Sequence, residues 1–200
     1  MPAPSERFPI LVKDIYPGIA PERFGRIHEG KVVFITGGGT GLGLAAAKAF
    51  ARTGAKIFIS ARRVATLENA RAEIEFIGGE ADFAVVDVTD SKSVAAGVAA
   101  AIKRFGKIDI VIANAGKESE MGKKLGEVDA NDWYSTVDVS LKGSYFTAHA
   151  TLPHLIESKG YIILLSSSLA QSRLPGNSAY NIAKHSLNRL VEWIDIGEFR

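Results

Sequence analysis

The 200-residue chain contains no cysteine. It therefore has no disulfide framework, no thiolate nucleophile and no thiolate metal site, and a reducing, cytoplasmic location is expected. The chain also lacks an excess of charge of either sign, because 24 Lys and Arg residues stand against 22 Asp and Glu residues. A net charge of +2 without a basic cluster predicts no binding to nucleic acid or to an anionic membrane.

Long apolar runs are missing as well. The longest uncharged run, Val32–Ala47, is broken by five glycines and two threonines, which is unsuited to a membrane span. The first seven residues lack the apolar core of a secretory signal. The four histidines are not spaced as zinc ligands, so no metal site is expected, and no P-loop motif is present.

Two regions differ in character. Residues 1–29 hold five of the seven prolines and show no periodicity, which indicates an extension on the domain surface. Over residues 30–200, short apolar runs alternate with segments of helical period. The predicted strands are Val32–Ile35, Ile57–Ile59, Phe83–Val86, Ile108–Ile112 and Tyr161–Leu165; the predicted helices are Gly43–Arg52, Ala65–Phe76, Ser91–Phe105, Asn131–Leu152 and Ala179–Ile196.

This alternation predicts one α/β domain. We expect a doubly wound, Rossmann-like parallel sheet of about five strands with helices on both faces. The apolar runs are nearly free of charge, which is typical of parallel strands that are covered on both sides. Ser91 is a plausible N-cap for the third helix.

A glycine-rich segment joins the first strand to the first helix. Glycines there allow a tight turn and the close approach of a pyrophosphate, whose charge the free N–H groups and the helix dipole receive. A flexible turn without a ligand is the alternative. We predict a dinucleotide site that includes Thr36, Gly37, Thr40, Gly41, Leu42 and Gly43.

The end of the second strand bears on which dinucleotide binds. No acidic residue lies between Gly54 and Leu67, and the strand is followed by Arg62 and Arg63. A guanidinium can bind a 2′-phosphate that a carboxylate would repel, so NADP(H) is favoured over NAD(H). The alternative is that both arginines are exposed to water at the strand end and bind no ligand.

Later strand ends offer further contacts. Asp87 could approach the adenine amino group and Val88 could cover the ring, although such an aspartate is more often a turn acceptor. After the fourth strand, Asn114, Ala115 and Gly116 would let the backbone pass near the nicotinamide ribose. Asn114 could equally tie neighbouring strands together.

Tyr180 and Lys184 lie four residues apart, on one face of the last predicted helix. A phenol is a poor acid or base at neutral pH, and a nearby lysine cation stabilises its phenolate. Such pairs also occur by chance on exposed helices. Three serines, among them Ser167, follow the fifth strand at the end where open α/β sheets bind ligands, so a hydroxyl there could bind a substrate carbonyl.

Taken together, these motifs resemble those of the short-chain dehydrogenase/reductase family over Gly30–Ile196, and Asn188–Trp193 is most similar to members from filamentous fungi. The resemblance implies that Tyr180 exchanges a proton with the substrate oxygen and that Ser167, or Ser168 if the register differs by one, steadies that oxygen. It also implies that Lys184 binds the nicotinamide ribose. The reaction would be hydride transfer between the cofactor and a ketone, aldehyde or secondary alcohol.

Two features depart from the family pattern. Ser140 stands where the family has a catalytic asparagine that holds a relay water, so we expect a weakened relay. The chain reaches Arg200 without the last one or two strands of the fold, which predicts an uncovered fifth strand and crippled catalysis in a C-terminally truncated form.

A different functional class also fits these departures, namely a dinucleotide-binding module without turnover that acts as a sensor or assembly partner. The resemblance further implies a homodimer through residues 131–152 and 179–196.

Overall fold

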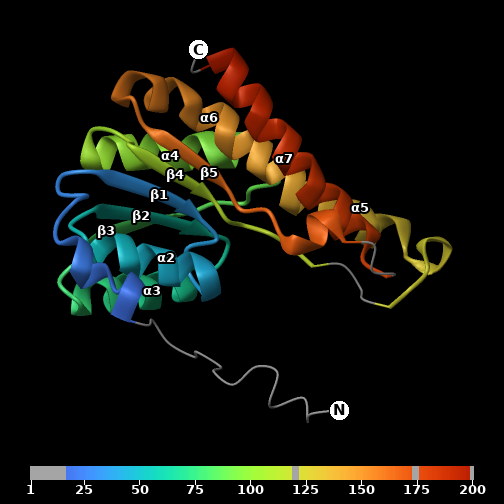
Figure 1. Cartoon of the computed structure of the whole chain (residues 1–200), viewed down its shortest axis with the longest axis horizontal. Helices are drawn as coiled ribbons and strands as arrows, with labels where there is room; N and C mark the ends of the chain where they lie inside the picture. The colour runs from blue at the N-terminus through green and yellow to red at the C-terminus, as the bar shows by residue number, and fades with distance from the viewer. Residues whose placement is uncertain (1–16, 119–121, 173–175, 199–200) are drawn as a thin grey trace, which may run out of the picture.

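The computed structural model describes residues 17–118, 122–172 and 176–198 (Figure 1). Five parallel strands form one sheet in the order β3-β2-β1-β4-β5. Their bounds are β1 (Val32–Thr36), β2 (Lys56–Ala61), β3 (Glu80–Val85), β4 (Ile110–Ala113) and β5 (Tyr161–Leu164). The doubly wound parallel sheet predicted from the sequence is confirmed. The strand order reverses between β1 and β4, and open sheets of this kind bind ligands at that point.

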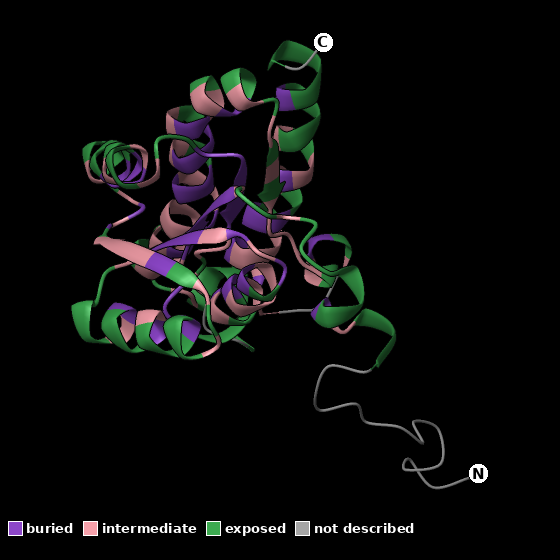
Figure 2. Ribbon diagram, turned by 90° about the vertical axis from the view of Figure 1, so that its left-hand side faces the viewer, coloured by how far each residue is buried: buried purple, intermediate pink, exposed green. Residues whose placement is uncertain are grey.

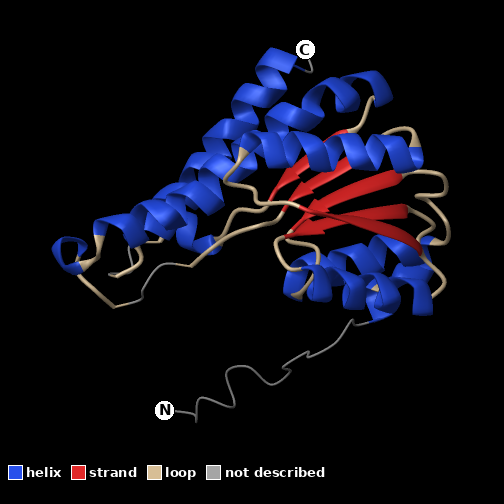
Figure 3. Ribbon diagram, turned by 180° about the vertical axis from the view of Figure 1, so that it is seen from behind, coloured by secondary structure: helices blue, strands red, loops and turns tan. Residues whose placement is uncertain are grey.

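Helices cover both faces of the sheet (Figures 1 and 3). One face carries α2 (Gly41–Arg52) and α3 (Val64–Phe76), and the other carries α4 (Ser91–Phe105) and α6 (Gly143–Ser158). The short helix α5 (Ala130–Val137) lies beyond the carboxyl ends of the strands, and α7 (Ser178–Glu198) packs against α5, α6 and β5.

The core has two layers, because alternate residues of a strand point to opposite faces. Val33 and Ile35 of β1 pack toward α2 and α3, whereas Phe34 packs with Phe58 toward α4 and α6. All of these side chains are buried, as is most of the central sheet in Figure 2. The buried central strands hold the loops at their carboxyl ends in fixed positions.

The two edge strands are less buried than the central strands, and the uncovered fifth strand agrees with the prediction. In β5, Tyr161 is 71% exposed and Ile163 is 44% exposed, because β5 pairs only with β4 within the described residues. At the other edge, β3 begins at Glu80, three residues before the predicted Phe83. The apolar pattern missed this start because Glu80 and Asp82 are charged; both pair with Arg104 of α4 at 3.1 Å.

The helix predicted over Asn131–Leu152 is interrupted. After α5 the backbone forms one π-helical turn, η4 (Asp138–Lys142), before α6 continues past Pro153 to Ser158. The predicted cap of α4 is also wrong by one residue. Asp90 is the N-cap, and its carboxylate accepts a 2.9 Å hydrogen bond from the Lys92 N–H.

The described part of the predicted extension, residues 17–29, lies on the surface against α2. It contains two short 3₁₀ turns, Pro17–Ile19 and Pro21–Phe24. Nδ1 of His28 lies 2.8 Å from Oγ1 of Thr53, and its ring centroid lies 4.8 Å from that of Phe50. Burial and the neighbouring Lys31 cation lower the pKa of His28. Among the helices described, none combines the length and hydropathy needed to cross a bilayer.

Candidate active site

A cleft of about 410 Å³ opens at the carboxyl ends of the central strands. The following predicted site residues line it: Gly37, Thr40, Arg62, Arg63, Asp87, Val88, Asn114, Ala115 and Gly116. The structure thus brings together residues from the ends of all four strands β1 to β4. The residues that line this cleft do not include the other predicted site residues, which are Thr36, Gly41, Leu42, Gly43, Ser140, Ser167, Ser168, Tyr180 and Lys184.

The glycine segment packs too closely for side chains at three positions, because a Cβ at Gly38 would lie 2.6 Å from Cγ2 of Ile59 and the positions of Gly37 and Gly43 are also crowded. A Cβ at Gly37 would lie 2.8 Å from Nδ2 of Asn114, and Gly37 has a φ of 66°. A Cβ at Gly43 would lie 2.3 Å from the Gly37 carbonyl oxygen, so the start of α2 rests directly on the loop. Gly41, with a φ of 55°, has open space around it, and Thr40 and Leu42 are exposed. The loop therefore presents backbone to the cleft.

Thr36 and Asn114 fix the strand ends beneath this loop. The Asn114 side-chain amide donates to the carbonyl oxygens of Thr36 and Gly37, at 3.0 and 3.1 Å. The Thr36 hydroxyl accepts from the N–H groups of Asn114 and Ala115, each at 3.2 Å. Asn114 therefore ties two strands together, one of the two roles expected of it. Thr36 is 1% exposed and, like the buried Gly43, supports the cleft from within and does not line it.

Cations gather at one end of the cleft. Arg62 and Arg63 are exposed there, at the junction of β2 and α3. Hydrogen bonds from the N–H and hydroxyl of Thr89 lower the pKa of Asp87, against an opposing effect of burial, and the Arg62 and Lys142 cations lower it further. Asp87 is thus an ionised turn acceptor whose carboxylate also lines the cleft.

Lys184 lies buried beside Tyr180 on α7. Its Nζ is 5.5 Å from the centroid of the Tyr180 ring and donates a 2.6 Å hydrogen bond to the Leu165 carbonyl oxygen. The Ser166 hydroxyl donates to the Lys184 carbonyl oxygen at 2.9 Å, so the end of β5 and α7 are tied together twice. Burial lowers the pKa of the Lys184 ammonium.

Gly116 connects this pair to the cleft. A Cβ at Gly116 would lie 3.6 Å from Nζ of Lys184 and 3.7 Å from Oγ of Ser140. Gly116 itself lines the cleft, so the lysine amine lies next to a residue of the cleft lining. Among the predicted catalytic serines, Ser167 accepts a 3.2 Å hydrogen bond from the Leu169 N–H, and Ser168 is exposed at the start of the next turn.

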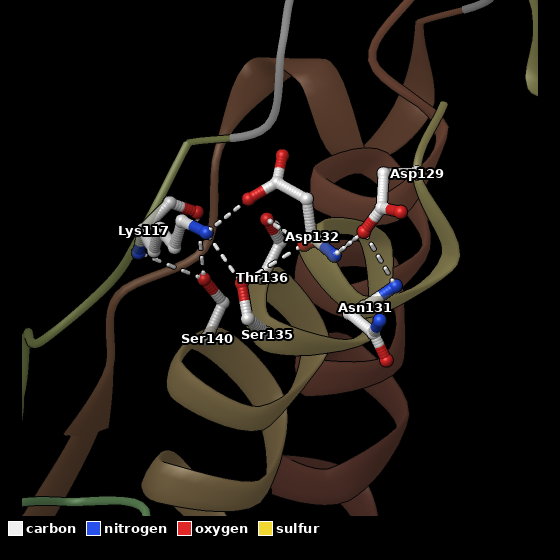
Figure 4. Close-up of polar contacts among 7 residues, drawn as sticks. All are labelled: Lys117, Asp129, Asn131, Asp132, Ser135, Thr136 and Ser140. Carbon is white, nitrogen blue, oxygen red and sulfur yellow. Dashed lines mark hydrogen bonds and ion pairs between the residues drawn. The ribbon is translucent and has the colours of Figure 1, made fainter. Parts of the chain in front are cut away.

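Ser140 lies in the π-helical turn and binds the loop after β4 (Figure 4). Its hydroxyl accepts from the Lys117 N–H and donates to the Lys117 carbonyl oxygen, both at 3.1 Å. The Ser140 carbonyl oxygen accepts a 3.0 Å hydrogen bond from the Ser144 hydroxyl. Because its single proton goes to Lys117, the Ser140 hydroxyl acts as a clamp on this loop.

Sequence reasoning missed several residues that line the cleft. Lys117 could have been found, since it directly follows the Asn114–Gly116 motif. The other missed residues are Gly39, Ala61, Thr66, Val86 and Val139. Gly39 lies within the predicted glycine segment, and Ala61, Val86 and Val139 each directly precede a predicted site residue, whereas Thr66 reaches the cleft only through tertiary packing.

Comparisons with known proteins agree with this geometry. The family model described as short chain dehydrogenase matches residues 31–195. An uncharacterised oxidoreductase of Listeria monocytogenes is 36% identical over 82% of this chain, and a short chain dehydrogenase of Pseudocercospora fijiensis is 33% identical over 90% of it. The chain spans only 66% and 58%, respectively, of the lengths of these relatives.

Solved structures show the same fold. NAD⁺-bound xylitol dehydrogenase superposes with a TM-score of 0.81 at 27% identity, covering 85% of this chain and 65% of that chain. An alcohol dehydrogenase from the archaeon Thermococcus sibiricus, complexed with 5-hydroxy-NADP, superposes with a TM-score of 0.80 at 31% identity, covering 84% and 71%. The family match, the strand order and the cleft at the switch point agree, and the chain belongs to the short-chain dehydrogenase/reductase family.

Proposed function

We propose that this chain is an NADP(H)-dependent oxidoreductase acting on a ketone, an aldehyde or a secondary alcohol. The observation that carries the proposal is the buried Lys184 amine, which lies beside the Tyr180 ring and next to Gly116, a residue that lines the cleft. A lysine cation in that place stabilises the negative charge of a phenolate, which a tyrosine acting as acid and base must carry in turn.

The cleft fits a nicotinamide dinucleotide. Gly37 and Thr40 would receive the pyrophosphate on backbone N–H groups near the start of α2, where the helix dipole favours negative charge. Arg62 and Arg63 would bind the 2′-phosphate, and Asp87 and Val88 would face the adenine. When bound, the nicotinamide would supply or accept the hydride. Xylitol dehydrogenase was solved with NAD⁺ and the archaeal alcohol dehydrogenase with 5-hydroxy-NADP, so these two structures do not favour either cofactor. The proposed preference for NADP(H) over NAD(H) therefore rests on the two arginines of this chain.

The protein's own groups would move the proton. In the reducing direction Tyr180 donates its hydroxyl proton to the substrate oxygen, and in the oxidising direction its phenolate removes that proton. Lys184 stabilises the phenolate, and the Ser167 hydroxyl, with Ser168 as the alternative, donates a hydrogen bond to the same oxygen.

The activity is tested under single-turnover conditions, with the protein in excess over NADPH and a panel of ketones and aldehydes. Loss of the NADPH absorbance with at least one carbonyl compound is the expected result. Tight NADPH binding without any loss across the panel would contradict the proposal and would favour a binding module without turnover.

The cofactor preference predicts the effect of removing the arginines. The variant with Arg62→Ala and Arg63→Ala loses two donors to a 2′-phosphate, and hydrogen bonds to charged groups contribute about 1.5–3 kcal/mol each. We therefore expect NADPH affinity to fall by at least about 10-fold, with NADH affinity nearly unchanged. Fluorescence titration with both cofactors measures this, with Arg189→Ala on α7 as the control. Equal weakening of NADPH and NADH would be evidence against 2′-phosphate recognition.

We also propose a homodimer formed through α5, α6 and α7. Large apolar side chains of these helices are exposed in the single chain, including Tyr134, Tyr145, Trp193 and Ile196. Burying them against a second copy would remove this apolar surface from water. Light scattering at micromolar concentration should give the mass of two chains, and the mass of one chain would contradict the proposal.

A further inference from the structure

We propose that Lys117 is a positioning residue that holds the loop after β4 in place next to the amine of Lys184. It does so by two attachments to the helical segment formed by α5 and η4. The inference rests on the proposed function, because it assigns to Lys117 a task in aligning Tyr180 and Lys184 with the cleft. Lys117 differs from Tyr180, Lys184 and Ser167 because its proposed effect on the reaction is indirect and passes through the residues that it holds in place.

The first attachment is made by the side chain. The Lys117 ammonium pairs with the Asp132 carboxylate at 2.5 Å and also donates to the Ser135 hydroxyl (Figure 4). Both partners lie on α5, whose first turn is fixed by the Asp129 carboxylate accepting from the N–H groups of Asn131 and Asp132. The ammonium therefore binds a well-anchored helix start.

The charge state of Asp132 fits this arrangement. The hydrogen bond from Lys117 lowers the pKa of Asp132, against an opposing effect of burial, and the Lys117 charge, the Ser135 hydroxyl and Lys123 lower it further. The carboxylate is therefore ionised at neutral pH and available to the Lys117 ammonium. It also lies in the first turn of α5, where the helix dipole favours negative charge.

The second attachment is made by the backbone. The Ser140 hydroxyl binds both the N–H and the carbonyl oxygen of Lys117, eight residues along the chain from Asp132. One residue of the loop is thus held at both ends by the same helical segment. The preceding residue, Gly116, is therefore held next to Nζ of Lys184, which forms the proposed catalytic pair with Tyr180.

Each attachment is weak by itself. The Lys117 and Asp132 side chains are 38% and 32% exposed, and ion pairs of that exposure contribute little to overall stability. A serine hydroxyl has one proton and reaches less far than an amide. Both contacts hold the same loop, so losing either is expected to loosen it, and the two losses are expected to overlap.

The test measures loop order and turnover in parallel. Lys117→Met and, independently, Asp132→Asn remove the ion pair; Lys117→Arg keeps a cation for Asp132; Ser140→Ala removes the clamp. Lys103→Met on α4, which makes the same substitution at an exposed lysine away from the cleft, is the control. Amide hydrogen exchange of Lys117 reports loop order without cofactor or substrate, and single-turnover kinetics reports its effect on the reaction.

In Lys117→Met and in Asp132→Asn we expect the backbone amide of residue 117 to exchange about 10-fold faster than in the wild type. The rate of hydride transfer should fall about 10-fold, and NADPH affinity should stay within about 2-fold of the wild type. Lys117→Arg should restore most of both values. The double variant that combines Lys117→Met with Ser140→Ala should transfer hydride at least as fast as the slower of the two single variants. The inference would be overturned if the amide of residue 117 exchanged at the wild-type rate in the single variants. It would also be overturned if the rate loss of the double variant equalled the product of the two single losses.

The outcomes separate this inference from the proposed function. If the wild type binds NADPH without reducing any carbonyl compound, the proposed function fails, and the exchange data alone then decide on the two-point attachment. If the wild type turns over and Lys117→Met matches Lys103→Met in rate and exchange, only the positioning role is refuted.

Discussion

Tyr180→Phe should lower the rate of hydride transfer by about 10²–10⁴-fold, the range expected for the loss of a general acid or base. The change removes one hydroxyl and leaves the ring next to Lys184, so the packing of α7 on the end of β5 should be kept. NADPH affinity should therefore stay within a few-fold of the wild type. Single-turnover measurement of NADPH consumption, together with a fluorescence titration, separates these two effects.

The matched control is Tyr161→Phe, which removes a hydroxyl from a tyrosine that is 71% exposed on β5. This variant should keep the wild-type rate. If Tyr180→Phe also kept it, another group would have to supply the proton, and the assignment of Tyr180 would be wrong. A loss of NADPH binding equal to the loss of rate would instead indicate a structural role for the hydroxyl.

Asp109→Ala should cost about 1–3 kcal/mol of the free energy of unfolding, because it leaves the buried Val32 N–H without its acceptor and removes the carboxylate that pairs with two half-exposed lysines. Asp109 is 2% exposed and lies at the amino ends of the strands, opposite the cleft. Its carboxylate accepts from the Val32 N–H at 2.9 Å and pairs with Lys31 and Lys107, each at 3.0 Å. Urea denaturation measures the loss, and a change below about 0.5 kcal/mol would contradict this account.

The same carboxylate predicts a pH dependence. Burial acts to raise the pKa of Asp109, but hydrogen bonds from Val32, Lys107 and Lys31 outweigh burial and hold the pKa below its ordinary value of 3.8. The charge therefore adds stability above that value, and the contribution is lost as the pH falls through the lower pKa of the folded state. The difference in unfolding free energy between the wild type and Asp109→Asn should be constant from about pH 7 to 5 and shrink toward about pH 3. A constant difference down to about pH 3 would contradict the prediction.

The features that sequence patterns predicted are those set by local rules. Buried parallel strands require continuous apolar runs, so β1, β2 and β4 could be located, and the glycine segment ahead of α2 marked the cleft. Spacing on one helix face likewise placed Tyr180 and Lys184 together.

The features that were missed depend on tertiary position. Glu80 is tolerated in β3 because Arg104 of α4 pairs with it. The contacts of Lys117 with Asp132 of α5 and with Ser140 of the π-helical turn join residues that are 15 and 23 positions apart in sequence.

The central claim is that one cleft brings a nicotinamide next to the Tyr180 hydroxyl. The most direct test is a nuclear Overhauser experiment on the chain with isotope-labelled tyrosine in complex with NADP⁺. We predict a cross-peak between the nicotinamide C4 proton and the Tyr180 ring, and its absence in Tyr180→Phe. Bound NADP⁺ whose nicotinamide protons give cross-peaks only to another tyrosine, such as Tyr134, would contradict the claim.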